Sequence, residues 1–365
     1  MGKVFKKIAV ILAILVGVLV LAVGGYVLYV VLQYSRIEDN YMLEVSGGAE
    51  ESVPVGENLT ALTYNIGFGA YEPSFSFFMD SGKMKSGEEV SGKYAKARSE
   101  ETARKNTEGA AALAKAQEAD FYLFQEVDTE GDRARGVNQY EALTRTLGES
   151  YARTFAVNFH SAKLLYPFND PIGKNTSGLA AYSRYRVSEA VRRQYPVDTG
   201  FAKFFDLDRC FSLHRLPAEN GKELVLINSH MSAYDEGGAI RAKQLELLNG
   251  VLAEEYAKGN YVIVGGDFNH DIAGSLNLFE TEQEVPEWVF VLQDKDIAEG
   301  FSFAAAVNAP TCRSTDMPYE KGVNYTVVLD GFIVSDNVEV VQTENVDNDF
   351  LYSDHNPAKM TFLLR

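Results

Sequence analysis

The sequence predicts an α+β domain, built as a sandwich of two packed sheets with helices on their outer faces, and one transmembrane helix in front of it. Three observations support this class. Short apolar runs typical of strands are many, while helical patterns are few and lie far apart. The most conspicuous polar residues stand at the ends of such runs. A long apolar stretch without any charge opens the chain.

The uncharged stretch runs from Ile8 to Leu32. At ~1.5 Å of rise per residue it is long enough to cross a hydrocarbon core of ~30 Å. A cleavable signal peptide is the alternative, but its apolar core would span only about 7–15 residues. The stretch also exits through Tyr26, Tyr29 and Tyr34, which suit a membrane interface. We therefore expect an uncleaved transmembrane anchor over residues 8–32.

The charges on either side of the anchor predict its orientation. Residues 1–7 contain three lysines, whereas the segment after the anchor is acidic and carries Arg36 as its one basic residue as far as Glu51. The positive-inside rule then places the short N-terminus in the cytoplasm. Residues 33–58, rich in Gly, Glu and Ser, are predicted to form a juxtamembrane linker. Residues 59–365 follow as an extracytoplasmic domain of a single-pass membrane protein.

The domain is strongly acidic. The chain has a formal net charge of −17, and because residues 1–39 carry four basic and two acidic side chains, the rest is near −19. Such a surface lacks the basic footprint of a protein that binds nucleic acid tightly, so the charge disfavours duplex DNA as a substrate. A nuclease stays an alternative, because a bound metal ion can supply positive charge locally.

The chain has two cysteines, Cys210 and Cys312. Outside the cytoplasm a disulfide between them is chemically allowed. Two buried free thiols are the favoured interpretation, and neither cysteine has the spacing of a metal ligand.

Two helix–strand units place carboxylates at the ends of strands. A helix is predicted to begin at Ser99 and to end at Asp120, before a short strand whose end presents Glu126. A second helix, from Ala239 to Lys258, precedes a strand that presents Asp267. The other predicted strands are Leu59 to Ile66, Gly178 to Ser183, Cys210 to Leu216, Leu224 to Ser229, Val327 to Val334 and Met360 to Leu364.

Three carboxylates stand where an apolar pattern does not explain them. Glu126 is expected either to pair in a salt bridge at the sheet edge or to bind Mg²⁺, which prefers carboxylates, water and phosphate oxygens. Asp267 follows two glycines that allow close backbone approach, and with Asn269 it can act on water and a phosphoryl oxygen. An Asx-turn is the alternative there. Asp330 lies within a predicted apolar strand, where an unpaired carboxylate would be costly.

Four segments together resemble a known superfamily. They are Thr63-Tyr64-Asn65-Ile66-Gly67, Phe124-Gln125-Glu126-Val127, Gly265-Gly266-Asp267-Phe268-Asn269 and Ser353-Asp354-His355-Asn356. In this order they resemble the endonuclease/exonuclease/phosphatase superfamily, whose members are metal-dependent phosphoesterases such as deoxyribonucleases and sphingomyelinases. The resemblance covers roughly residues 59–365 and implies a four-layered α/β/β/α sandwich.

The resemblance also implies roles for individual residues. Asn65, Glu126 and Asp354 match the metal environment, with Mg²⁺ as the expected ion and Mn²⁺ as an alternative. Asp267 matches the residue that aligns the attacking water. The other implied catalytic residues are His230, in a segment similar to the superfamily's Asn-Thr-His motif, Asn269, which contacts the phosphoryl group, and Asp330, which orients His355. Whether His355 is a base or a charged stabiliser, and whether one metal binds or two, the sequence leaves open.

Two further segments have two interpretations each. The excursion from Tyr71 to Arg98 carries Phe75, Phe77 and Phe78, which suit either a loop that binds substrate or membrane or an ordinary packed insertion. The segment from Asp128 to Asn138, with Arg133 and Arg135, suits either anion recognition or a solvated charged loop.

The sequence thus predicts a membrane-anchored, extracytoplasmic, Mg²⁺-dependent phosphoesterase that hydrolyses a phosphodiester or phosphomonoester by attack of water. The expected substrate is a small or lipid-linked phosphoester. The alternatives are an extracytoplasmic nuclease and a binding module of the same fold that has lost its chemistry. The sequence indicates no protein partner.

Overall fold

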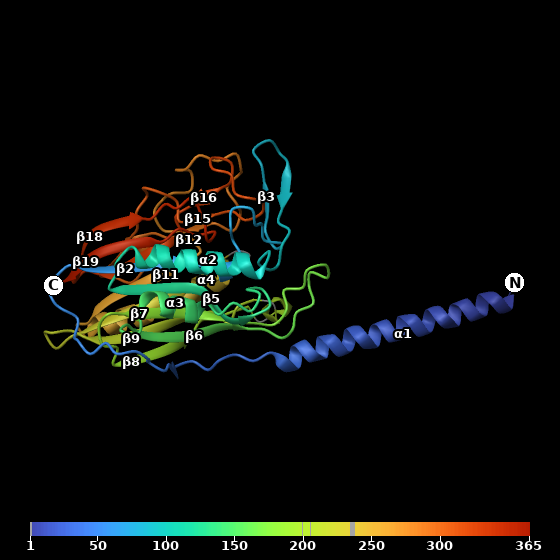
Figure 1. The fold of residues 1–365 in the computed structure, drawn as a ribbon, viewed down its shortest axis with the longest axis horizontal. Helices are drawn as coiled ribbons and strands as arrows, with labels where there is room; N and C mark the ends of the chain where they lie inside the picture. Colours follow the sequence, from blue (N-terminus) through green and yellow to red (C-terminus); the bar gives the residue numbers. More distant parts are fainter. Residues whose placement is uncertain (1, 199, 205, 234–237) are drawn as a thin grey trace.

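The computed structural model describes residues 2–198, 200–204, 206–233 and 238–365. A long N-terminal helix, α1 (Gly2–Gln33), projects from one end of a two-sheet domain (Figure 1). By length and composition α1 could cross a membrane, and its apolar window is not buried in the protein. The helix therefore has the features predicted for an anchor.

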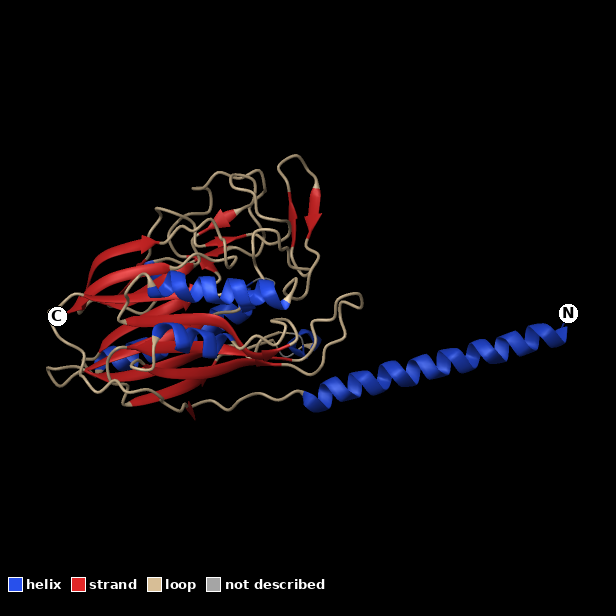
Figure 2. Cartoon of the chain, viewed as in Figure 1, coloured by secondary structure: helices blue, strands red, loops and turns tan. Residues whose placement is uncertain are grey.

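The domain contains two large sheets, coloured as strands in Figure 2. The seven-stranded sheet has the order β1 (Tyr41–Met42), β8 (Glu189–Gln194), β9 (Cys210–Pro217), β10 (Glu223–His230), β11 (Tyr261–Asp267), β17 (Asp330–Ser335) and β14 (Phe301–Ala304). The six-stranded sheet has the order β18 (Val338–Asn345), β19 (Ala358–Leu364), β2 (Leu59–Asn65), β5 (Phe121–Gly131), β7 (Asn175–Ser183) and β6 (Ala152–His160). Both sheets mix parallel and antiparallel pairs.

The remaining elements are short ribbons and helices. The ribbons are β3 (Ser81–Lys83) with β4 (Glu89–Ser91), β12 (His270–Asp271) with β13 (Phe290–Val291), and β15 (Cys312–Arg313) with β16 (Thr326–Val327). The helices of the domain are α2 (Glu100–Lys115), α3 (Gln139–Leu147) and α4 (Ala239–Ala257), with short 3₁₀ turns at Gly67–Gly69, Phe201–Phe204 and Asp294–Asp296.

Three apolar cores show the predicted layers. Leu224 and Leu226 on β10 point between the sheets, toward Leu123 of β5, while Val225 and Ile227 point outward to α4. This alternation within a continuous apolar run is what a strand buried on both faces requires. On the opposite side α2 and α3 cover the outer face of the six-stranded sheet. The order is helix, sheet, sheet, helix, so the predicted α+β, four-layered α/β/β/α sandwich is confirmed.

Several predicted boundaries were wrong. The helix that Ser99 caps ends at Lys115, several residues before Asp120. The strand predicted from Val327 begins at Asp330. The strand that begins at Phe121 continues through Glu126 to Gly131 instead of ending before Glu126. In that last case the strand is longer because β7 pairs with it along its whole length.

Residues 33–58 run along the domain surface and contact both sheets. The Arg36 guanidinium lies 2.7 Å from the Asp208 carboxylate, and β1 pairs with β8. Farther along, the backbone N–H of Val53 donates to the carbonyl of Pro217 at 2.8 Å. The segment between the anchor and the domain is therefore held on the domain surface by backbone and ionic contacts.

Candidate active site

Three predicted residues lie side by side at one edge of the seven-stranded sheet. His230 ends β10, Asp267 ends β11, and Asp330 begins β17. His230 is in register with Asp267, which is in register with Asp330. Because β10 and β11 are parallel, and β17 runs antiparallel to β11, two strand ends and one strand start meet at the same edge. The fold alone thus gathers these side chains.

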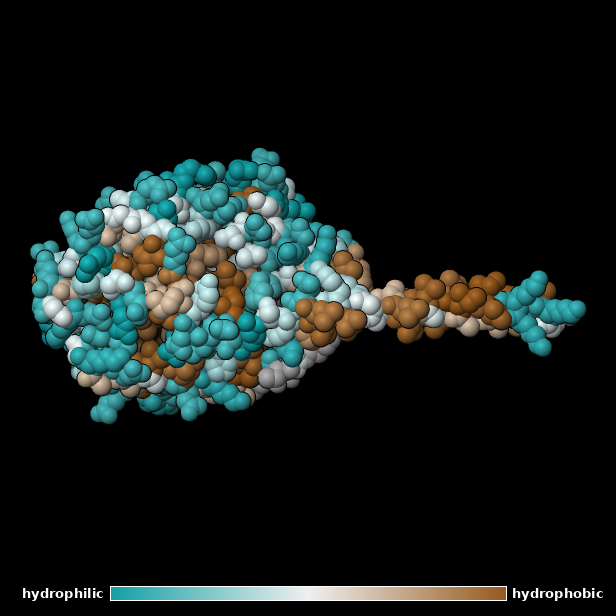
Figure 3. Space-filling view, turned by 90° about the horizontal axis from the view of Figure 1, so that it is seen from below, coloured by the Kyte–Doolittle hydropathy of each residue, from teal (hydrophilic) through white to brown (hydrophobic). Residues whose placement is uncertain are grey.

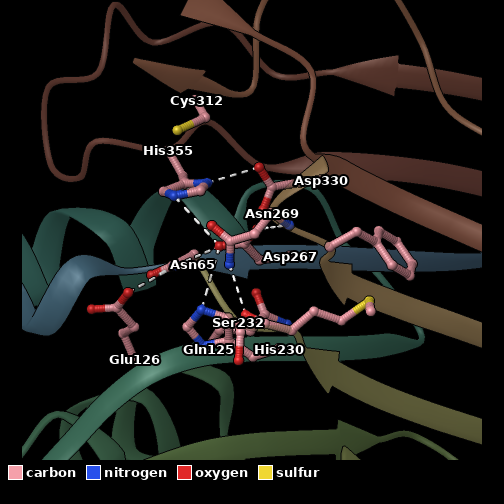
Figure 4. A network of polar contacts seen from close by, with 12 residues as sticks. Asn65, Gln125, Glu126, His230, Ser232, Asp267, Asn269, Cys312, Asp330 and His355 are labelled. Carbon is pink, nitrogen blue, oxygen red and sulfur yellow. Dashed lines mark hydrogen bonds and ion pairs between the residues drawn. The ribbon is translucent and has the colours of Figure 1, made fainter. Parts of the chain in front are cut away.

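Asn65 reaches the same point from the other sheet. It ends β2, and its Nδ2 donates to Asp267 Oδ2 at 3.1 Å and to Glu126 Oε1 at 3.2 Å (Figure 4). Its Oδ1 accepts the backbone N–H of Gly67 at 3.0 Å. The amide therefore both forms a local turn and joins the carboxylates of the two sheets.

The segment Gly265-Gly266-Asp267 combines close packing with a local turn. A Cβ on Gly266 would lie 1.9 Å from the Ser229 carbonyl oxygen of the neighbouring strand, so no side chain fits there. Asp267 Oδ1 accepts the backbone N–H of Asn269 at 2.8 Å, and Asn269 has a positive φ of 50°. One carboxylate oxygen thus makes the Asx-turn that the sequence left as an alternative. The other oxygen, Oδ2, is directed toward the rest of the site.

Two histidines converge on Asp267 Oδ2. The Nε2 atoms of His230 and His355 each lie 3.6 Å from it. On its other side His355 hydrogen-bonds through Nδ1 to Asp330 Oδ2 at 2.7 Å (Figure 4). Asp330 is fully buried, and its backbone N–H donates to Thr311 Oγ1 at 3.0 Å. The imidazole of His355 is therefore fixed between two carboxylates.

The surroundings of the two histidines give them different charges. Burial lowers the pKa of His230 to about 3, and the positive charge of Arg209 acts in the same direction. Burial alone would lower the pKa of His355 as well, but the negative charges around it, led by Asp330, raise it well above 6.5. His230 is thus neutral, and His355 carries a positive charge.

The two carboxylates beside His355 also differ. Burial raises the pKa of Asp330 to about 6, although the hydrogen bond to His355 opposes this rise. Burial would raise the pKa of Asp267 too, but the two imidazoles and the N–H donors of Asn269 and Asn65 lower it overall. Asp267 is therefore ionised and can accept a proton or align a water molecule.

Glu126 lies in a β-bulge within β5, not at the end of the strand. The pairing with β7 shifts by one residue between Phe124 and Val127, and Glu126 has a φ of 53°. A bulge turns a side chain out of the regular alternation. Here it directs the half-buried carboxylate of Glu126 toward the site (Figure 4).

Glu126 and Asp354 form an oxygen-rich pair that fits a hard cation. Burial raises the pKa of Glu126, which Arg133 opposes and the negative charge of Asp354 reinforces. Burial likewise raises the pKa of Asp354. A divalent cation would stabilise both as carboxylates, and all-oxygen donors favour Mg²⁺ or Mn²⁺. Asp267, Asp330 and His355 offer a second group of potential ligand atoms, all within 4.8 Å of one another.

Comparison with known proteins agrees with this geometry. The sequence model of the Endonuclease/Exonuclease/phosphatase family matches residues 62–355. The chain belongs to this family. Its members are generally hydrolases of phosphoesters and typically depend on a divalent metal. No curated protein matches the sequence.

Solved structures share the fold at low sequence identity. A family protein from Beutenbergia cavernae is 14% identical with a TM-score of 0.52, over 84% of this chain and 72% of that one. One from Bacteroides vulgatus is 16% identical with a TM-score of 0.51, over 85% of this chain and 100% of that one. TDP2 from D. rerio, in complex with a single-strand DNA product, is 13% identical with a TM-score of 0.50, over 84% and 99%.

The candidate active site opens into a cavity of about 650 Å³. Three arginines line this cavity, and the sequence did not predict that they would lie together. Arg133, Arg209 and Arg313 line it, and all three are buried. Arg133 lies 2.7 Å from the Asp128 carboxylate and stacks over the ring of Phe68. Arg133 is thus part of a buried ion pair at the cavity and not of a solvated loop, and anion recognition by this segment stays a prediction. These arginines are far apart in sequence, and only the fold gathers them.

The phenylalanine-rich excursion and Cys312 also contribute to the candidate active site. Phe75 is fully buried, whereas Phe77 and Phe78 line the cavity, so the excursion is a packed insertion that forms one cavity wall. Cys312 forms a β-bridge with His355, and burial raises the pKa of its thiol to about 12. Both Cys210 and Cys312 are free and buried, as the sequence favoured.

Proposed function

We propose that this protein is a metal-dependent phosphoesterase, anchored in the membrane by α1 and carrying its catalytic domain on the extracytoplasmic side. The observation that carries the proposal is the convergence of Asn65, His230 and His355 on the ionised carboxylate of Asp267. A carboxylate that is buried, held in its charged form and part of the lining of a cavity suits the activation of water.

The residues support hydrolysis by direct attack of water. The water oxygen forms a new bond to phosphorus, and the phosphorus–oxygen bond to the leaving group breaks. The leaving oxygen takes up a proton from solvent, which balances the proton that the water gives up. Asp267 aligns the water and accepts its proton. Asn269 and His230 lie beside Asp267 and stabilise the phosphoryl oxygens. His355, which Asp330 holds in place, donates a hydrogen bond from Nε2 to the phosphate.

Glu126 and Asp354 would hold the metal ion. When bound, Mg²⁺ neutralises negative charge on the phosphate. Asn65, also predicted as a ligand, donates its Nδ2 to Glu126 Oε1 and Asp267 Oδ2, so we assign it the task of positioning both carboxylates.

A nuclease is the second candidate, and the three buried arginines of the cavity favour it. They could bind the phosphates of a single strand. Against duplex DNA stands the net charge of −17. Besides Asp267 and Asp354, four more aspartates line the cavity: Asp80, Asp198, Asp206 and Asp316.

The test is a substrate panel with the purified full-length protein in detergent micelles and Mg²⁺. The panel contains bis(p-nitrophenyl) phosphate, p-nitrophenyl phosphate, phospholipid vesicles, a single-stranded oligonucleotide and duplex DNA. We expect faster turnover of a small or lipid phosphoester than of duplex DNA. A strong preference for duplex DNA would establish the nuclease instead, and lack of turnover across the panel would leave the inactive binding module.

The proposed topology predicts that protease added to intact spheroplasts removes the catalytic domain. The lysines in the first turns of α1 and the acidic segment after it support an outside domain by the positive-inside rule. Immunoblotting with an antibody against the C-terminal residues measures the loss. A cytoplasmic marker protein should stay intact in the same sample. Full protection of the domain until the membrane is lysed would show the opposite orientation.

A further inference from the structure

One loop joins the anchor to the wall of the active-site cavity. Residues 161–174 lie beside the domain end of α1 (Figure 1). The backbone N–H of Leu165 donates to the Tyr26 hydroxyl at 2.9 Å, and that hydroxyl contacts the carbonyl of Lys163 at 3.3 Å. The backbone N–H of Lys163 donates to the Tyr29 hydroxyl at 3.2 Å. Loop and helix are thus fixed to each other at three points.

The loop has two apolar faces. Its inner residues, Leu164 and Ile172, are buried and line the cavity. Its outer residues Leu165 and Phe168 are 41% and 86% exposed. Among the described residues, Phe168 is more exposed than any large hydrophobic side chain of the anchor itself. Tyr166, 56% exposed, belongs to both faces because it also lines the cavity.

The position of the loop along α1 corresponds to a membrane surface. From Ile8, about 20 helical residues cross the hydrocarbon core, which places the outer boundary near Tyr26 and Tyr29. These are the two tyrosines that hold the loop. Arg36, just after α1, holds the domain in its orientation relative to the helix, because its guanidinium lies 2.7 Å from the Asp208 carboxylate. Hydrophobic residues also gather where α1 meets the domain (Figure 3).

We propose that residues 161–174 are a membrane-contacting loop and that the substrate is a membrane lipid with a phosphoester head group. This inference rests on the proposed function. The phosphate would enter the cavity beside Tyr166 and Met79, a 48% exposed residue that also lines it, while the acyl chains stay against the outer face of the loop. Hydrolysis breaks one phosphorus–oxygen bond, and the lipid or head-group alcohol leaves with a proton.

The first experiment measures membrane contact without any activity. Full-length Phe168→Trp is reconstituted in phosphatidylcholine vesicles that contain a dibrominated acyl chain. We expect quenching of the added tryptophan fluorescence, after subtraction of the unmodified protein, whose one tryptophan is Trp288. The control is Val341→Trp, because Val341 is 50% exposed on β18, at the end of the sandwich opposite α1 (Figure 1). Equal quenching at both positions, or at neither, overturns the membrane-contacting loop.

The second experiment measures the substrate class. In the same vesicles, release of phospholipid head group is compared with cleavage of soluble bis(p-nitrophenyl) phosphate. For Leu165→Ser/Phe168→Ser we expect the ratio of lipid to soluble turnover to fall about ten-fold or more, since the loss of two large apolar contacts weakens seating on the membrane. Val341→Ser should keep the ratio of the unmodified protein.

The outcomes separate the two proposals. An unchanged ratio in the loop variant, or an unmodified protein that cleaves only the soluble ester, overturns the lipid substrate and leaves the phosphoesterase standing. Cleavage of the lipid but not of the soluble ester, if it is lost in the loop variant, supports both the phosphoesterase and the lipid substrate. No cleavage of either compound overturns the proposed function and the lipid substrate with it, while the quenching result still decides the membrane contact.

Discussion

Replacing Asp267 with Asn is expected to lower phosphoester turnover by about 10²–10⁴-fold, the range typical of a lost catalytic group. The substitution removes the charge on which Asn65, His230 and His355 converge. It keeps an acceptor oxygen for the backbone N–H of Asn269, so the Asx-turn and the strand end should survive. The measurement is kcat/KM on the best substrate of the panel.

The matched control is Asp336→Asn. Asp336 is exposed, lies outside the cavity and accepts a hydrogen bond from the Tyr256 hydroxyl at 2.6 Å. It should keep full turnover, and both variants should keep the circular dichroism spectrum and melting temperature of the unmodified protein within a few degrees. Near-full turnover in a folded Asp267→Asn variant would show that the assigned site is not the catalytic one.

The central strands were predictable because both of their faces are buried. β10 and β11 read as continuous apolar runs, bounded by polar residues at one edge. The prediction missed four strands of four or more residues in the two large sheets, β6, β8, β14 and β18, and all four lie at or next to a sheet edge. In β18 only the two end residues, Val338 and Asn345, are buried, so its strand conformation depends on pairing with β19. Such pairing leaves little trace in the local sequence.

In the candidate site too, some features could be predicted from the local sequence and others depend on contacts between distant segments. Asn65, His230 and Asp267 each end a strand, and a motif at a strand end predicts its position well. The bulge at Glu126 was not predictable, because it is a mismatch in pairing between β5 and β7. The cluster of Arg133, Arg209 and Arg313 depends on three different loops or strand ends meeting around one cavity, which no local pattern encodes.

Removal of divalent metal is expected to abolish turnover, and Mg²⁺ or Mn²⁺ should restore it. Burial and the nearby charge of Asp354 raise the pKa of Glu126, so without a cation the two carboxylates oppose each other in a partly desolvated site. A bound ion removes this repulsion and therefore also stabilises the folded chain, by about 2.7 kcal/mol at an ion concentration 100 times the Kd. The first measurement is turnover in excess EDTA. The control is turnover in EDTA that is already saturated with Mg²⁺.

The stabilisation supplies a second measurement that does not depend on turnover. Mg²⁺ should raise the melting temperature of the unmodified protein and of Glu282→Gln, since Glu282 is exposed and outside the cavity. In Glu126→Gln the shift should be lost or should require much higher Mg²⁺, because a neutral amide replaces one of the two carboxylates in the oxygen-rich pair. Full turnover in excess EDTA, or activity with Zn²⁺ alone, would contradict a hard-cation site. An undiminished Mg²⁺ shift in Glu126→Gln would place the ion elsewhere in the cavity, with Asp267, Asp330 and His355 as the next donor group to test.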